Sequence, residues 1–183
     1  MKKPSRFVAL FRGINVGKAK RIAMADLRKL LESLGFTNVV TLLNSGNAIF
    51  DGPTEPPAKL AKRIRAAVND KLGVDALVVV KSAEEIAAVV AGNKLASIAT
   101  DPSRLLVALT TDAAGLARLA PLARSQWKGE LVHVGKHAAY AWCANGILKS
   151  KAQAALLRDL AESGTTRNWA TIEKIDAMLR RPS

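Results

Sequence analysis

The order of short apolar segments and amphipathic segments limits the fold of this chain more than any other feature. Residues 7–11 are uniformly apolar, which is typical of a buried strand, and residues 25–34 repeat apolar side chains at steps of three and four, which is typical of one helix face. The expected elements of the first half are strands at 7–11, 39–43, 48–50 and 76–81 and helices at 25–34 and 58–72. The first half therefore predicts the order β-α-β-β-α-β.

The second half repeats most of this order. Its expected elements are strands at 104–109, 130–134 and 138–143 and helices at 113–122, 150–160 and 169–179. Read along the chain they give β-α-β-β-α-α, so a helix replaces the last strand of the pattern. A further helix, opened by the capping box of Ser82 and Glu85, links the two halves.

The order β-α-β-β-α-β is that of the split β-α-β unit of ferredoxin-like folds. The sequence therefore predicts an α+β fold of two ferredoxin-like halves, spanning residues 7–92 and 103–181. The link between them is short and not of low complexity, so we do not expect freely moving domains. The alternative is that the halves form one compact unit.

Positive charge is concentrated at the amino end of the chain. The formal net charge is +13, and residues 1–30 contain nine Lys or Arg and a single acid. The excess lies chiefly on Lys2, Lys3, Arg6, Arg12, Lys18, Lys20 and Arg21. Such a patch raises the local concentration of anions, which favours an anionic partner; the alternative is that the charge only keeps the protein in solution. Because 49% of the residues are hydrophobic, the patch is not part of a disordered basic chain.

The sequence also disfavours several classes of site and location. The single cysteine, Cys143, rules out an intrachain disulfide and a cysteine-rich zinc site, and we expect neither a metal nor a cofactor. No apolar run reaches the roughly 18 residues of a membrane-spanning helix, and the run at 7–11 is too short for a signal peptide. We therefore expect a soluble, cytoplasmic protein without a membrane partner, and its oligomeric state stays open.

The first candidate site is the loop that follows the first strand, at residues 12–21. Its sequence resembles a phosphate-binding loop, but only three residues separate its two glycines, and neither Ser nor Thr follows its lysine. We therefore expect no Walker site. A looser anion site could form from backbone amides with Arg12, Lys18 and Arg21. The alternative is a flexible basic loop.

The second candidate site is the tetrapeptide at residues 44–47. Asn44, Ser45 and Asn47 surround a glycine, so they can bind a polar ligand with amide and hydroxyl groups, or they can simply form a turn. An activated serine needs an adjacent base, and the sequence offers none beside Ser45. We therefore do not interpret Ser45 as a nucleophile.

The third candidate site is the polar tract at 165–169, together with Lys151. Arg167 is a fork-shaped donor suited to phosphate or carboxylate, and Trp169 could stack on a ring or pack in the core. The candidate ligand-binding residues are thus Arg12, Asn15, Gly17, Lys18, Arg21, Asn44, Ser45, Asn47, Lys151, Arg167, Asn168 and Trp169.

Four ordered motifs resemble those of one bacterial family, and they lie at residues 8–17, 24–28, 44–50 and 166–171. By these motifs the chain is identified as a member of the family catalogued as domain of unknown function 1697, and the resemblance covers nearly the whole chain. It implies paired ferredoxin-like units and no assigned activity. The motif positions in this sequence are Arg12, Gly13, Asn15, Gly17, Ser45, Gly46, Asn47, Lys151, Arg167, Asn168 and Trp169.

Three functions agree with these features. The first is binding of an anionic ligand, either a nucleic acid or a nucleotide-like molecule, through the basic amino-terminal patch. Aromatic residues make up only 4% of the chain, which argues against RNA recognition by base stacking. The second is an enzyme for a small phosphorylated or carboxylated substrate, which would gather the candidate residues in one pocket but has no obvious general base. The third is a structural or interaction module without a ligand.

Overall fold

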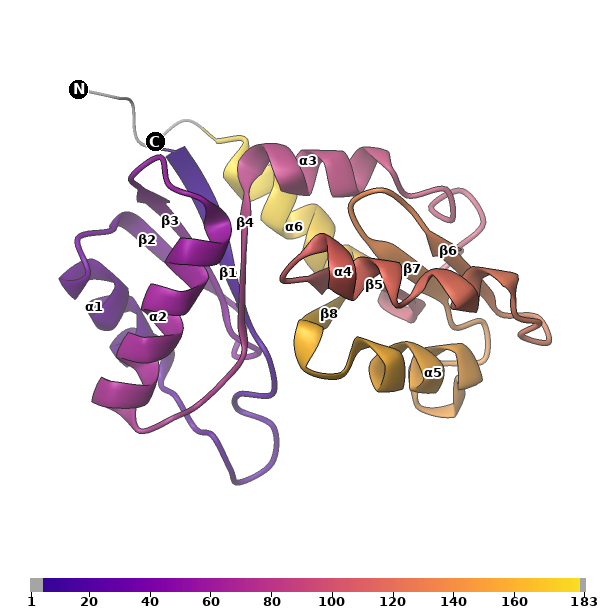
Figure 1. The fold of residues 1–183 in the computed structure, drawn as a ribbon, viewed down its shortest axis with the longest axis horizontal. Coiled ribbons are helices and arrows are strands. Elements are labelled where there is room, and N and C mark those ends of the chain that lie inside the picture. The colour runs from indigo at the N-terminus through magenta and orange to yellow at the C-terminus, as the bar shows by residue number, and fades with distance from the viewer. Residues whose placement is uncertain (1–4, 182–183) are drawn as a thin grey trace. The chain divides into compact units, whose positions relative to one another are not determined.

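The computed structural model describes residues 5–181, so Lys2 and Lys3 of the basic patch lie outside the described residues. The chain divides into two compact units, Met1–Glu84 with Ile175–Ser183 and Glu85–Lys174 (Figure 1). Each unit contains one four-stranded sheet. None of the helices between residues 5 and 181 combines the length and the apolar character that a membrane crossing requires.

The first unit has the predicted ferredoxin-like order. Its elements are β1 (Ser5–Phe11), α1 (Met24–Ser33), β2 (Thr37–Leu42), β3 (Asn47–Gly52), α2 (Pro57–Leu72) and β4 (Val78–Ser82). The sheet order is β2-β3-β1-β4, and every neighbouring pair is antiparallel. The prediction of a ferredoxin-like first half is confirmed.

Helices α1 and α2 lie on one face of the sheet of the first unit because each has a single apolar face (Figure 1). On β1 the alternate residues Phe7, Ala9 and Phe11 face these helices, as the two-residue period of a strand requires. Gly73 takes a left-handed φ of 65° and ends α2. The buried helix residues are Leu27, Leu30 and Leu31 of α1 and Leu60, Ile64 and Val68 of α2.

The second unit has the same sheet order as the first. Its elements are β5 (Leu105–Thr110), α4 (Ala113–Ala117), β6 (Leu131–Val134), β7 (Ala139–Trp142), α5 (Lys151–Leu160) and β8 (Gly164–Asn168). The order in the sheet is β6-β7-β5-β8, with antiparallel neighbours. Two helices, α3 (Ala83–Ala91) and α6 (Trp169–Leu179), contain the boundaries between the units.

The prediction that a helix replaces the last strand of the second half is wrong. Residues 164–168 form β8, which pairs along β5 from Thr110 opposite Gly164 to Leu106 opposite Asn168. The sequence of this strand is Gly-Thr-Thr-Arg-Asn, without one large apolar side chain. Burial alternates along this strand as in a half-buried strand, because Thr165 and Arg167 are buried. The buried side chains are polar, so the sequence shows no matching alternation of apolar and polar residues.

A buried tyrosine joins β7 to α3 within the second unit. Tyr140 is only 1% exposed, and its hydroxyl donates a hydrogen bond of 2.6 Å to the carbonyl oxygen of Val89. Burial raises the pKa of Tyr140 to about 12, because the phenolate would lose its hydration. Tyr140 is the single tyrosine of the chain, so its ionisation can be followed directly.

We expect this tyrosine to make the protein less stable in alkali. Above about pH 10 the tyrosine of the unfolded chain loses its proton, whereas the folded one keeps it up to about pH 12, so the free energy of unfolding falls as the pH rises through this window. Tyr140→Phe should remove this component, and loss of the hydrogen bond should lower stability at neutral pH by about 1 kcal/mol. Urea unfolding of both proteins across the alkaline range measures the effect. Equal pH slopes for the two proteins would contradict it.

Candidate functional site

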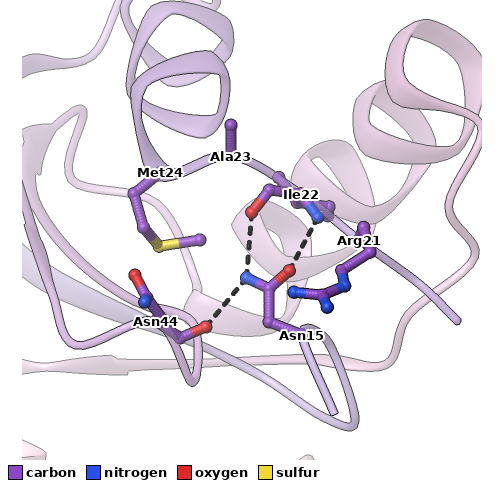
Figure 2. A pocket seen from close by; sticks show the side chains of 6 residues that line it. All are labelled: Asn15, Arg21, Ile22, Ala23, Met24 and Asn44. Atoms are coloured by element: carbon purple, nitrogen blue, oxygen red, sulfur yellow. Dashed lines mark hydrogen bonds between the residues drawn. The ribbon is translucent and has the colours of Figure 1, made fainter. Parts of the chain in front are cut away.

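The loop between β1 and α1, residues 12–23 and here named the basic loop, is held by one asparagine (Figure 2). The side-chain amide of Asn15 donates to the carbonyl oxygen of Ile22 at 2.9 Å, and its Oδ1 accepts from the backbone nitrogen of Ile22 at 2.9 Å. The backbone nitrogen of Asn15 donates to Lys20 at 3.0 Å. Four of the loop residues have a left-handed backbone: Gly13, Asn15, Gly17 and Lys20, with φ of 68°, 57°, 64° and 51°. The loop is therefore closed by specific bonds.

The same asparagine joins the basic loop to the turn between β2 and β3, residues 43–46. Its Nδ2 also donates to the backbone carbonyl of Asn44 at 2.8 Å, and the backbone nitrogen of Phe11 donates to Gly46 at 2.9 Å. Gly46 has a φ of 82°, and a Cβ at this position would lie 2.5 Å from Cδ1 of Ile14. The structure therefore brings together two of the three predicted tracts.

A pocket of about 380 Å³ opens where these two segments meet. Figure 2 shows Arg21 on one side of the Asn15 amide, and Met24 and Asn44 on the other. Arg21 is exposed, and no ion pair within the described chain engages it. The full lining is Asn15, Arg21, Ile22, Ala23, Met24 and Asn44.

Exposed basic side chains lie in the loop beside this pocket. Lys18 and Lys20 are exposed in the same loop as Arg21. Hydrogen bonds from Arg65 lower the pKa of the exposed carboxylate of Asp75, and the charge of Lys20 contributes to the same shift. Ala23 provides no side-chain cap to α1, whose amino end forms part of the pocket wall, and the acid Asp26 lies in the first turn of this helix.

The other predicted residues of the first unit support the turn and the strand ends. Asn47 is fully buried and donates to the carbonyl oxygen of Leu42 at 2.7 Å and to Oγ of Ser45 at 3.2 Å. Ser45 itself is exposed in the turn. Arg12 is half-buried where β1 ends, and its backbone nitrogen donates to Leu77 at 2.9 Å. None of these three lines the pocket.

The third predicted tract belongs to the second unit. Arg167 is 8% exposed on β8, and its Nη1 donates to Oγ1 of Thr165 at 2.9 Å and to the carbonyl oxygen of Thr166 at 2.8 Å. Burial lowers the pKa of Arg167 to about 10. This tract therefore belongs to a different unit from the other two tracts.

Three further candidates of the second unit mark helix starts. Asn168 directly precedes α6, and its Oδ1 accepts from the backbone nitrogen of Thr171 at 2.9 Å and from the Thr171 hydroxyl at 2.7 Å. Trp169, the first residue of that helix, is 7% exposed and thus part of the core. Lys151 is exposed as the first residue of α5.

Sequence reasoning missed the apolar wall of the pocket, which consists of Ile22, Ala23 and Met24. Ile22 and Ala23 directly precede α1 and Met24 begins it, so apolar side chains here do not stand out from those of the helix face. The signal that could have identified them is their position immediately after the basic loop. Across residues 5–181, the structure brings no three metal-ligating side chains together.

Comparison with known proteins identifies the family but no activity. The chain is similar to the structure of the conserved bacterial protein SP0830 from Streptococcus pneumoniae, with a TM-score of 0.80 and 26% identity over 97% of this chain and 100% of that chain. No curated protein matches. The family model described as protein of unknown function (DUF1697) matches residues 5–140, more than half of the chain. The chain therefore belongs to this family, as its four sequence motifs indicated.

Proposed function

We propose that the protein binds an anionic ligand, a nucleic acid or a nucleotide-like molecule, in the pocket between the basic loop and the β2–β3 turn. The observation that carries this proposal is Arg21, a guanidinium that lines the pocket without an ion-pair partner in residues 5–181. A guanidinium presents several donors in a planar fork that matches phosphate and carboxylate oxygens. Lys18 in the same loop would add to the attraction.

The pocket is held in place by hydrogen bonds, so a ligand can bind without a large conformational change. Both N–H groups of the Asn15 amide are used in holding Ile22 and Asn44, so the two segments of the pocket are fixed to each other before a ligand arrives. A preformed site avoids part of the ordering entropy that binding otherwise costs. Asn15 is therefore a positioning residue in this proposal, and Arg21 is the residue that contacts the ligand.

The same lining favours a binding protein over an enzyme. Its six residues include no carboxylate, imidazole, thiol or hydroxyl, so none of them can act as a general base or a nucleophile. The pocket by itself can attract an anion, orient it and exclude water from it. The proposed function is therefore recognition.

We expect anion binding that depends on salt and on the basic loop. Purified protein should bind tripolyphosphate, a labelled single-stranded oligonucleotide, or both at low salt, and binding should weaken at physiological salt because the contact is between charges. The double variant Lys18→Ala/Arg21→Ala should bind at least about 10-fold more weakly, since a hydrogen bond to a charged group contributes about 1.5–3 kcal/mol. Fluorescence polarisation and isothermal titration calorimetry measure these affinities.

A matched control distinguishes the pocket from net charge. Lys62→Ala removes an exposed lysine from α2, outside the pocket lining, and should leave the affinity nearly unchanged. Failure of both anions to bind at low salt would disprove the proposal. Equal losses in Lys62→Ala and in the loop variants would also disprove it, because attraction would then come from overall charge.

A further inference from the structure

The positive charge of the first unit is less continuous than its sequence suggests. Outside the basic loop, Lys29, Lys62 and Lys71 are exposed and unpaired among residues 5–181, whereas several other basic side chains of the first unit are paired with acids. These pairs are Arg28–Glu32 at 2.9 Å, Lys59–Glu55 at 3.4 Å, Arg65–Asp75 at 2.7 Å and Arg180–Asp176 at 2.8 Å. Single-stranded nucleic acids are bound along positively charged grooves that follow several nucleotides. The pairing therefore favours a ligand with one anionic end.

A further basic side chain is engaged by packing. The guanidinium of Arg63 lies 4.8 Å from the centre of the Phe36 ring and donates to the carbonyl oxygen of Leu34. Arg6 forms an ion pair with Asp51, with 3.1 Å between Nε and Oδ1. Lys18 and Arg21, three positions apart, have no such engagement within the described chain. Of these two, Arg21 lines the pocket, and Lys18 lies elsewhere in the basic loop.

The two ends of the pocket differ in chemistry. Arg21 provides charge on one side of Asn15, whereas Met24 and Asn44 provide a thioether and an amide on the other (Figure 2). The Asn44 carbonyl accepts the bond from Asn15, but the Asn44 side-chain amide has no hydrogen-bond partner among residues 5–181. A free amide offers one donor group and one acceptor, the combination that pairs with the edge of a nucleobase. A thioether packs well against the face or edge of an aromatic ring.

The volume of the pocket sets the size of the ligand. At about 380 Å³ it lies near the lower end of the roughly 300–1,000 Å³ that small-molecule sites occupy. That volume suits one nucleotide and is too small for several.

We propose that the pocket binds a nucleoside monophosphate, with its phosphate against Arg21 and its base against Met24 and Asn44. This inference rests on the proposed function, because it names the class of anion that the same pocket takes. Polymeric nucleic acid, which the amino-terminal charge also suggested, is the competing outcome of the test.

Calorimetric titration at low salt tests the assignment with four kinds of probe: the four ribonucleoside 5′-monophosphates, the corresponding nucleosides, inorganic phosphate and a single-stranded oligonucleotide. At least one monophosphate should bind about 10-fold or more tightly than both its nucleoside and phosphate, because only the monophosphate reaches both ends of the pocket. Arg21→Ala should weaken that monophosphate about 10- to 100-fold and leave the nucleoside unchanged. Asn44→Ala, which keeps the carbonyl that Asn15 needs, should weaken the monophosphate and leave phosphate unchanged.

The outcomes separate this inference from the proposed function. If monophosphates bind no more tightly than phosphate, and binding still needs Arg21, the inference is overturned and the proposal of anion binding remains. If an oligonucleotide binds much more tightly than every monophosphate, the inference is also overturned, and the ligand is a polymeric nucleic acid. No binding of any phosphate-bearing probe would overturn both. Lys62→Ala serves again as the control for charge alone.

Discussion

Replacing Gly164 by alanine should destabilise the second unit by about 3 kcal/mol. Gly164 opens β8 opposite Thr110 of β5, and a Cβ at this position would lie 2.3 Å from the backbone carbonyl oxygen of Leu109 and 2.8 Å from Cδ1 of Leu160. The first of these atoms belongs to the backbone of the central strand, so it cannot rotate away. Relief requires the strands to separate, and overpacking of this kind costs about 1–3 kcal/mol or more.

The expected effect at Gly164 comes from a steric clash and not from an unfavourable backbone conformation, so a glycine with open space around it serves as the control. The φ of Gly164 is 178°, an extended value open to any residue. Gly135, in the turn between β6 and β7, also lacks a left-handed φ, and the nearest atoms to an added Cβ lie at an ordinary 3.5 Å. Gly135→Ala should therefore change stability by less than about 0.5 kcal/mol. Urea unfolding followed by tryptophan fluorescence measures both variants, and equal stabilities would refute the steric argument.

Replacing Asp51 by alanine should destabilise the first unit by about 3 kcal/mol. Asp51 is 3% exposed on β3; its Oδ1 lies 3.1 Å from Nε of Arg6, and its Oδ2 accepts from the Asn38 amide at 2.8 Å. Without the carboxylate, the mostly buried Arg6 guanidinium loses its counter-charge. Removing one partner of a buried ion pair costs about 3–5 kcal/mol, and the partial exposure of Arg6 places this case at the lower end.

Two companion variants test the cause of the Asp51 effect. In the double variant Arg6→Met/Asp51→Leu both charges are absent, so it should be more stable than Asp51→Ala. Asp75→Ala breaks the Arg65 pair on the surface, where solvent screens the charges, and should cost much less than Asp51→Ala. Far-ultraviolet circular dichroism during urea unfolding measures all three. A loss below 1 kcal/mol for Asp51→Ala would show that the pair contributes no more than a surface pair.

The sequence predicts those helices and strands whose buried positions are occupied by apolar residues. Residues 7–11 lie in β1, and Leu27, Leu30 and Leu31 of α1 are buried, because in both cases apolar side chains face the core. Strand β8 was missed for the opposite reason. Its buried positions hold Thr165 and Arg167, whose polar groups are satisfied by hydrogen bonds after folding. The hydrophobic pattern of a sequence does not show which polar side chains will find hydrogen-bond partners in the folded protein.

The candidate site is predictable in its parts and not in its assembly. The basic loop and the turn were each found from residue types, but the bond between Asn15 and the Asn44 carbonyl links positions 29 apart, and only the sheet brings them together. The net charge of +13 likewise gives no indication of which cations are paired. Arg28 and Arg21 look alike in the sequence, yet Arg28 is paired with Glu32 and Arg21 lines the pocket.

The division into two units also divides the chromophores of the protein. All four phenylalanines lie in the first unit, whereas the three tryptophans and the single tyrosine lie in the second. Intrinsic emission excited above the phenylalanine band therefore originates entirely in residues 85–174. An unfolding curve followed by this emission reports the second unit, and one followed by circular dichroism reports both. The difference between the two curves isolates the first unit, which contains the pocket, without any added label.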